Sequence, residues 1–157
     1  MTTPDSLNAV AEFHRTFHAP VLDTPQIPSD ARCGLRVALL AEELDELRDA
    51  IADKDLVAVA DALCDLQYVL AGAVLEFGLG EQFKALFDEV QRSNMSKACL
   101  TVEEAEATVA LYTAKGVACH YIESEGKYLV FRDADHKTLK SVGYSPANLV
   151  GVMSDKG

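Results

Sequence analysis

The stretch LVAVADALCDLQYVLAGAVLEF, residues 56–77, is apolar on nearly every side of the helix that its pattern predicts. At about 100° per residue, its leucine-rich side is the side we expect to face the core. That stripe consists of Leu56, Val59, Leu63, Leu66 and Leu70. The opposite side is apolar too and carries Val57, Ala58, Ala62, Tyr68 and Val69. The sequence therefore predicts a helical protein in which this segment is buried on both sides.

Two acidic residues interrupt this apolar helix. Asp61 and Asp65 lie one turn apart on one face, and no Lys or Arg within the helix can neutralise them. An unpaired buried carboxylate is costly, so both groups must be protonated, paired or bound to a metal ion. Their partners must come from another element.

The preceding helix supplies many carboxylates. AEELDELRDA, residues 41–50, holds five acids beside an apolar stripe of Val37, Leu40, Leu44, Leu47 and Ile51. Glu43 lies about 80° from the centre of that stripe, with Glu46 on the same flank. Asp45 and Asp49 point further away and are predicted to be ordinary surface acids, while Glu42 is intermediate.

The short link Asp53-Lys54-Asp55 predicts an antiparallel hairpin of these two helices. Residues whose numbers add up to about 108 then lie side by side. Glu43 faces Asp65, and Glu46 faces Asp61 or Ala62. Such carboxylates, with no histidine among them, favour Mg²⁺ or Mn²⁺ over zinc or copper. The alternative is a pair of salt-bridged helices that holds no metal.

The remaining pattern completes a mainly all-α fold. We expect an antiparallel bundle of about five helices, completed by oligomerisation, in a single domain spanning residues 1–157. The helices are predicted from Pro4 to about His18, from Ser29 or Asp30 to near Ala52, over 56–77, over 81–94, and from Thr101 to Gly116. VACHYI and KYLVFR, joined by ESEG, predict a β-hairpin over 117–132 as an elaboration within that domain, followed by an irregular tail.

Composition limits the partners. The net charge of −11 over 157 residues argues against nucleic acid or an anionic membrane as the main partner. The four cysteines have no CxxC spacing and are predicted to be reduced thiols of a cytoplasmic protein. The chain opens with no signal-peptide pattern, and we expect no apolar run of the roughly 18 residues needed to span a membrane.

Two acidic motifs resemble a known superfamily. Glu42-Glu43-Leu44-Asp45-Glu46 is similar to the EExxE motif of the all-α nucleoside triphosphate pyrophosphohydrolases, the MazG-like group related to dimeric dUTPases and phosphoribosyl-ATP pyrophosphohydrolase. Their ExxD motif on the next helix is matched by Asp65, but Ala62 stands at the usual Glu. Asp61 faces the same way and can substitute for it.

Two further stretches resemble a MazG-like subgroup. FDEVQRSNMSK, residues 87–97, contains its SNxSK pattern, and RDADHKTLKSVGYSP, residues 132–146, is similar to its DGKxLK pattern. His136 stands at the usual glycine. The resemblance thus covers most of the chain, with the predicted β-hairpin between the shared blocks.

The resemblance implies hydrolysis of a nucleoside triphosphate between its α- and β-phosphates, giving the monophosphate and pyrophosphate. A non-standard or deoxynucleotide, removed in a housecleaning role, is the expected substrate. Mg²⁺ or Mn²⁺ would be held by Glu43, Glu46, Asp61 and Asp65. Glu42 or Glu46 would accept the proton of the attacking water. Phosphate oxygens would be held by Asn94, Lys97, Lys137, Lys140 and Tyr144.

Superfamily members usually assemble as dimers or tetramers, so we expect a homodimer or homotetramer whose partner helices cover residues 56–77. Two rivals stay open. One is a phosphoribosyl-ATP-type pyrophosphohydrolase. The other is a catalytically weak helical oligomer that binds nucleotide or a protein, which the Ala62 departure favours. His14 with His18, and the acidic helix start at residues 103–106, are predicted to be structural.

Overall fold

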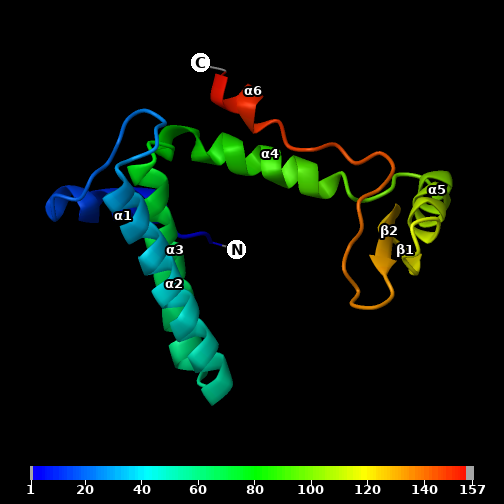
Figure 1. Ribbon diagram of the computed structural model, residues 1–157, viewed down its shortest axis with the longest axis horizontal. Coiled ribbons are helices and arrows are strands. Elements are labelled where there is room, and N and C mark those ends of the chain that lie inside the picture. The colour runs from blue at the N-terminus through cyan, green and yellow to red at the C-terminus, as the bar shows by residue number, and fades with distance from the viewer. Residues whose placement is uncertain (1, 155–157) are drawn as a thin grey trace. The chain divides into compact units, whose positions relative to one another are not determined.

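The computed structural model describes residues 2–154, which divide into two compact units, one up to Phe83 and one from Lys84 onward. Figure 1 shows the elements. They are α1 Ser6–Thr16, α2 Asp30–Asp53, α3 Leu56–Glu76, a 3₁₀ turn Gly80–Gln82, α4 Phe83–Met95, α5 Val102–Thr113, β1 Cys119–Ser124, β2 Lys127–Arg132 and α6 Leu149–Ser154. The predicted fold class, mainly helical with a C-terminal β-hairpin, is confirmed. The single domain over 1–157 stays a prediction.

The first unit is built on the α2–α3 hairpin, whose two helices lie side by side and antiparallel (Figure 1). Lys54, with φ of 58°, takes the left-handed conformation that ends α2. The Asp55 carboxylate then accepts hydrogen bonds from the backbone N–H groups of Val57 and Ala58 at 2.9 and 3.1 Å, which caps α3. The three-residue link is therefore a stop signal followed directly by a start signal.

Helix α1 packs on the C-terminal half of α3. Val10 and Ala11 form a small core with Ala71 and Leu75. The helix begins at Ser6 rather than Pro4, because the carboxylate of Asp5 accepts from the backbone and side-chain amides of Asn8 and caps the helix in place of Thr3. The predicted start at Pro4 was therefore too early.

The extended segment after α1 is tied to the end of α3. The backbone N–H groups of Leu22 and Gln26 donate to the carbonyls of Leu75 and Phe77 at 3.0 and 3.1 Å. Gly78 has φ of +68°, and a Cβ added there would lie 1.9 Å from the Thr24 carbonyl oxygen. Only glycine permits this close approach of two backbones.

The packed faces of α2 and α3 differ from the expected ones. Val37, Leu44 and Ile51 on α2 are exposed, and so are Leu56, Leu63 and Leu70 on α3. The face of α3 that becomes buried instead carries small residues such as Ala62 and Gly72. Small side chains let two helices approach closely. The other members of the predicted stripes, Leu40, Leu47, Val59 and Leu66, are half-buried, so the predicted core stripes are correct only in part.

Helix α3 bears on the expectation that no uninterrupted apolar run is long enough to span a membrane. Leu56–Glu76 is long and apolar enough, by length and composition alone, to cross a membrane. The core helix of a soluble protein passes the same test, and this helix carries Asp61 and Asp65 near its middle.

The second unit confirms the predicted hairpin. β1 pairs with β2 in antiparallel register, with Tyr121 opposite Val130. Glu125 and Gly126 at the turn both have positive φ, 50° and 72°, as a two-residue hairpin of right-handed twist requires. One face of the sheet packs on α5 around Cys99, Ala105, Val130 and Leu139.

Two local features complete this unit. The Thr101 hydroxyl caps α5 by accepting from the backbone N–H of Glu104 at 3.2 Å, as the sequence predicted. The tail that the sequence predicted to be irregular ends in a short helix, α6, with Asn148 accepting from the Gly151 N–H at 3.0 Å. All four cysteines are free, as predicted.

Candidate functional site

The register of the α2–α3 hairpin is the predicted one. Arg32 on α2 donates from Nε to Glu76 Oε2 on α3 at 2.9 Å. One turn along, a Cβ added to Gly72 would lie 2.6 Å from Nη1 of Arg36. In both pairs the residue numbers add up to 108, so the sum expected from the sequence is confirmed by two independent contacts. This register places Glu43 at the level of Asp65.

Glu43 is surrounded by like charges. It is half-buried, and desolvation raises the pKa of its carboxyl, followed by the negative charges of Glu46, Asp65, Glu42 and Asp61. The four neighbours come from both helices and are the acids that the sequence selected around Glu43. Asp65 is half-buried as well, whereas Glu42, Glu46 and Asp61 are exposed.

Asp45 and Asp49, by contrast, behave as the predicted surface acids. Both are exposed, and Asp45 accepts from Arg48 at 2.6 Å on the outer side of α2. Burial therefore separates Glu43 from Asp45 and Asp49 as predicted, but it does not separate Glu46, which is exposed like them. The alternative of two helices neutralised by salt bridges does not apply to Glu43.

The acids lie near one another but do not form a preorganised metal site. Across residues 2–154, no three carboxylate, histidine or cysteine side chains are arranged to hold one metal ion. Carboxylates of like charge repel one another, and the exposed ones extend into solvent. The donor set itself, oxygen atoms alone, fits a hard cation such as Mg²⁺. For the acids to converge on one metal ion, the exposed side chains of Glu46 and Asp61 would have to rotate.

Ala62, at the position of the family glutamate, is buried with 3% exposure. By the same register it lies at the level of Glu46. The methyl group of this alanine adds apolar surface beside the acids and supplies no oxygen ligand. Asp61, one residue earlier, is exposed and remains the candidate substitute.

A second group of predicted residues meets in the other unit. Lys97 Nζ donates to Asn94 Oδ1 at 2.8 Å, and Lys140 Nζ lies 4.3 Å from the centre of the Tyr144 ring. The Ser93 hydroxyl donates to Tyr144 Oη at 3.1 Å, and this bond lowers the pKa of Tyr144, helped by the charges of Lys140 and Lys97. We call Ser93, Asn94, Lys97, Lys140 and Tyr144 the basic group.

The basic group is held by the SNMSK segment and the tail. Ser96 Oγ accepts from the backbone N–H of Ser145 at 2.9 Å, and Ser141 Oγ donates to the Ser96 carbonyl at 2.9 Å. Lys137 does not join the group: it lies in the turn after β2, where its backbone N–H donates to Asp135 Oδ1 at 3.2 Å. Ser93 is the member that the sequence did not select, although it opens the SNxSK pattern.

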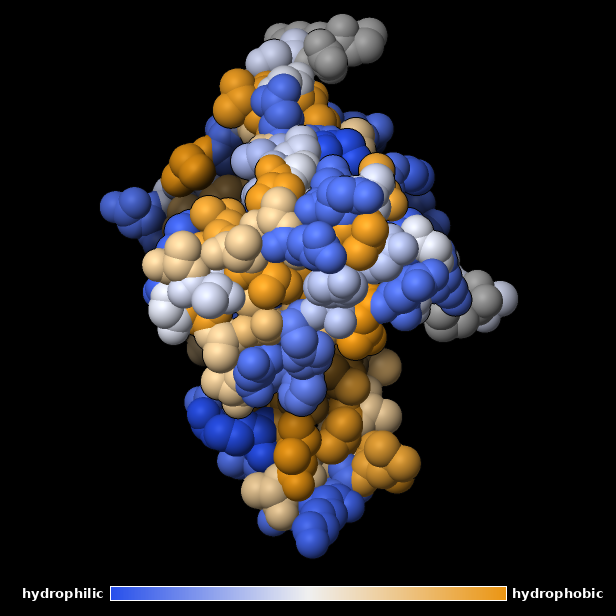
Figure 2. Space-filling view, turned by 90° about the vertical axis from the view of Figure 1, so that its right-hand side faces the viewer, coloured by the Kyte–Doolittle hydropathy of each residue, from blue (hydrophilic) through white to orange (hydrophobic). Residues whose placement is uncertain are grey.

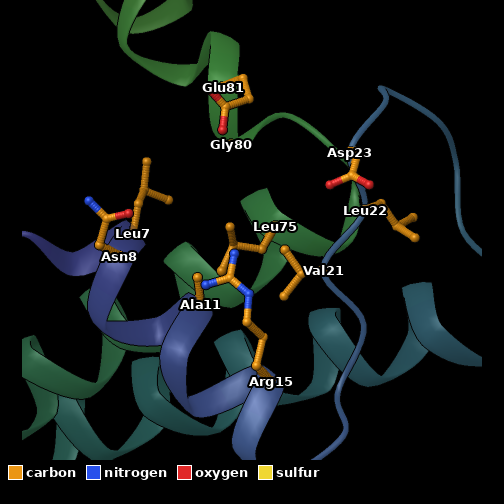
Figure 3. A pocket seen from close by; sticks show the side chains of 10 residues that line it. All are labelled: Leu7, Asn8, Ala11, Arg15, Val21, Leu22, Asp23, Leu75, Gly80 and Glu81. Atoms are coloured by element: carbon orange, nitrogen blue, oxygen red, sulfur yellow. The ribbon is translucent and has the colours of Figure 1, made fainter.

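A small cavity in the first unit contains none of the predicted site residues. Figure 3 shows apolar side chains of α1 and α3 at its base, with charged groups at its rim. It is lined by Leu7, Asn8, Ala11, Arg15, Val21, Leu22, Asp23, Leu75, Gly80 and Glu81. It is therefore separate from the acids of the hairpin.

The sequence also missed a buried ion triad. Glu76 is completely buried and accepts from both Arg32 and Arg36. Burial opposes ionisation of Glu76, but the hydrogen bonds from the two arginines prevail and lower its pKa. The sequence did contain a signal for this triad. Two arginines have i,i+4 spacing, and the residue numbers of Arg32 and Glu76 add up to 108, as the hairpin register requires.

Comparison with known proteins places this geometry in a family. The model of the family described as phosphoribosyl-ATP pyrophosphohydrolase matches residues 10–94, more than half of the chain. The chain belongs to the phosphoribosyl-ATP pyrophosphohydrolase family. This family is part of the MazG-like nucleotide pyrophosphohydrolase superfamily, so the resemblance seen in the acidic motifs is confirmed. The matched region includes the whole of α2 and α3.

An uncharacterized protein of Acanthamoeba polyphaga mimivirus is 31% identical to this family member over 93 residues. The matched part is 57% of this chain and 37% of the viral protein, so the chain spans little more than a third of that relative's length.

Proposed function

We propose that this protein hydrolyses a nucleoside triphosphate, a non-standard or deoxynucleotide, between its α- and β-phosphates with the help of Mg²⁺ or Mn²⁺. The observation that carries the proposal is the position of Glu43 among four carboxylates from two helices that the family match covers. Five acids at one place, none of them salt-bridged in the described structure, form a site whose repulsion a divalent cation relieves.

In this proposal the cation is held by Glu43, Glu46, Asp61 and Asp65. When bound, Mg²⁺ neutralises charge on the phosphate oxygens and lowers the pKa of a coordinated water. Glu42 or Glu46, both exposed, takes the proton of the attacking water. The water oxygen bonds to a phosphorus of the α–β anhydride, the bridging P–O bond breaks, and the monophosphate and pyrophosphate leave.

The basic group of the second unit is proposed to hold phosphate oxygens. Lys97 and Lys140 supply positive charge, and the Asn94 amide and Tyr144 hydroxyl supply hydrogen bonds. Lys137 is the weaker candidate, because its turn lies apart from the other four in the contacts of this unit. A housecleaning role in the cytoplasm would follow from this activity, without nucleic acid or a membrane as partner.

A pyrophosphate-release assay tests the proposal. Purified protein with Mg²⁺ is given each ribo- and deoxynucleoside triphosphate, common non-standard bases and phosphoribosyl-ATP. Glu46→Gln should reduce the turnover at least about 100-fold, as loss of a positioned acid–base group does. Asp49→Asn, an exposed acid one turn along the same helix, is the matched control and should retain activity. If no substrate releases pyrophosphate, the proposed enzymatic activity is refuted.

Phosphoribosyl-ATP is the second candidate substrate, since the matching family is described by that reaction. The same assay decides it: faster release from phosphoribosyl-ATP than from any triphosphate selects this alternative. A catalytically weak helical oligomer is the third. It predicts nucleotide binding without release, and buried Ala62 at the family glutamate position is the feature that favours it.

A second copy of the chain is the proposed partner, in a homodimer or homotetramer. The exposed residues Val37, Leu44 and Ile51 repeat every seven positions on α2, as Leu56, Leu63 and Leu70 do on α3. Figure 2 shows hydrophobic surface over the lower part of the view, where the α2–α3 hairpin lies. Seven-residue apolar repeats are the pattern by which helices pack against helices.

A further inference from the structure

The α2–α3 hairpin is held by a largely buried ion triad that lies two to three helical turns from the acids. Glu76 is completely buried and Arg36 is 7% exposed. Arg32 approaches Glu76 with two donors, Nε to Oε2 at 2.9 Å and Nη2 to Oε1, and Arg36 Nη2 donates to the same Oε1. Such a paired arrangement is directional and tolerates little sliding of one helix along the other.

Gly72 makes the room that the triad needs. A Cβ at this position would lie 2.6 Å from Arg36 Nη1 and 3.0 Å from Nε2 of His14. His14 is itself buried, and its Nδ1–H donates to the Pro20 carbonyl at 2.8 Å. Residues of α3 and α1 therefore enclose the guanidinium of Arg36 and restrict its position in the hairpin.

The triad and the acids share one packed face. On α2, Arg36 precedes Glu43 by seven residues, and on α3 Gly72 follows Asp65 by seven. Seven residues are close to two turns, so a given register at Arg36 and Gly72 imposes the same register at Glu43 and Asp65. A shift of one turn at the triad would move each acid past its partner.

The short link at Lys54 restricts the register at one end of the hairpin, and apolar packing adds little to it farther along the helices. The face that α3 turns to α2 carries Ala58, Ala62 and Val69, and residues of this kind would pack almost as well after a slip of one turn. A buried polar or charged group that specifies register at some cost in stability is a known device of paired helices.

We propose that Arg32, Arg36 and Glu76 are positioning residues that hold α2 and α3 in the register that brings Glu43 opposite Asp65. This inference rests on the proposed function of the acids as metal ligands. The triad touches neither the acids nor a substrate and acts through the two helices.

Replacement of the whole triad by apolar residues separates register from stability. The variant Arg32→Met/Arg36→Leu/Glu76→Leu removes the two buried charges of Arg36 and Glu76 together with the partly exposed charge of Arg32, a change that such sites often tolerate. We expect it to remain folded and to bind Mn²⁺ at least tenfold more weakly than the parent, measured by electron paramagnetic resonance of free Mn²⁺. Val10→Ala, which weakens the α1 core and leaves the triad intact, should keep the parent's affinity. An unchanged affinity in a folded triple variant would overturn the proposal.

A cross-linking experiment reports the register without any metal. In a Cys64→Ser background, Glu43→Cys with Asp65→Cys marks the native register, and Glu43→Cys with Val69→Cys marks a slip of one turn. With the triad present, only the first pair should form a disulfide. Without it, both pairs should. Exclusive cross-linking of the first pair in both backgrounds would contradict the inference.

Two milder variants serve if the triple variant does not fold. Gly72→Ala crowds the Arg36 guanidinium and, less closely, the His14 ring, and Arg36→Lys keeps its charge but not its planar donors. Both should permit the slipped disulfide, and native-only cross-linking in both would overturn the proposal. A parent that binds no Mn²⁺ while its cross-links follow the triad would defeat the proposed function and leave the register role standing.

Discussion

At the scale of single residues, Glu43 differs from the other acids of α2 because it is half-buried and has carboxylates on both helices as neighbours. Helical angle alone separated it from Asp45 and Asp49. Its neighbours on α3 followed once the hairpin register was assumed. The side-chain directions of Glu46 and Asp61 did not follow, because exposed side chains are set by solvent and by mutual repulsion rather than by packing.

The first prediction concerns Glu43→Gln. The pKa of Glu43 is raised in the folded protein, so its contribution to stability is present below the unfolded value of 4.5 and is lost as pH rises through the folded value. In metal-free protein at pH 7, Glu43→Gln should therefore raise Tm, while at pH 4 the two proteins should unfold at similar temperatures.

The same substitution removes a proposed ligand and should weaken the stabilisation by Mg²⁺ at least tenfold in metal concentration. Thermal unfolding across pH and Mg²⁺ concentration measures both effects. Asp49→Asn is the control and should change neither. A Glu43→Gln protein that is no more stable at pH 7 than the parent would contradict the assigned surroundings of this residue.

At the scale of elements, the α2–α3 hairpin is the part of the molecule that joins stability to the proposed chemistry. Its ends follow from local signals, the left-handed Lys54 and the Asp55 cap. Its register was predicted from the length of the link. Its rotation was predicted only in part, because the apolar stripes chosen by periodicity are half-buried or exposed, and the most buried face combines small residues with the triad.

The second prediction concerns Glu76→Gln. Loss of this charge leaves the buried Arg36 and the partly exposed Arg32 without a counterion, so the free energy of unfolding should fall by about 3–5 kcal/mol at pH 7. Because the pKa of Glu76 is lowered in the folded state, its stabilisation is present above the unfolded value of 4.5 and is lost as pH falls through the folded value.

Urea unfolding from pH 7 down to pH 3 should therefore show the parent and Glu76→Gln converging in acid. Glu12→Gln, at an exposed position on α1, should match the parent throughout. A difference between parent and Glu76→Gln that stays constant over this range would mean that the triad is not the source of the stabilisation.

At the scale of the whole molecule, the hairpin exposes large apolar side chains at seven-residue intervals on both of its helices. Monomeric soluble proteins rarely expose contiguous apolar patches of more than a few hundred Å². The sequence predicted a two-sided apolar α3, and the structure shows which side the single chain leaves uncovered. In the proposed homodimer or homotetramer, a second copy with the same seven-residue repeat covers this side.

The third prediction is that Leu44→Lys with Leu63→Lys converts the assembly to monomers. Two charges placed in the centre of an apolar helix interface carry a desolvation cost that association cannot recover. Light scattering after size-exclusion chromatography measures the mass. Ile27→Lys, at an even more exposed apolar residue outside the hairpin, is the control. A monomeric parent would refute the proposed partner, and an unchanged double variant would move the interface elsewhere.

Much of this protein was determined by local chemistry along the chain. Caps, left-handed stops and hydrophobic period were enough to predict α2, α3, α5 and the β-hairpin, because these signals act within a few residues. The acids around Glu43 could be selected as well, since helical angle and a short link leave few ways to pair two helices. The short α6 carried no such signal and was missed.

Tertiary structure decided which face of each helix is buried and which charges neutralise each other. Glu76 looked like an ordinary helix-end acid until Arg32 and Arg36 were placed beside it, in space that only Gly72 leaves open. Tertiary structure also brought together Asn94, Lys97, Lys140 and Tyr144, whereas Lys137 lies in another turn. The physical reason is that burial and ion pairing depend on residues distant in sequence, whose approach is the result of packing the whole unit.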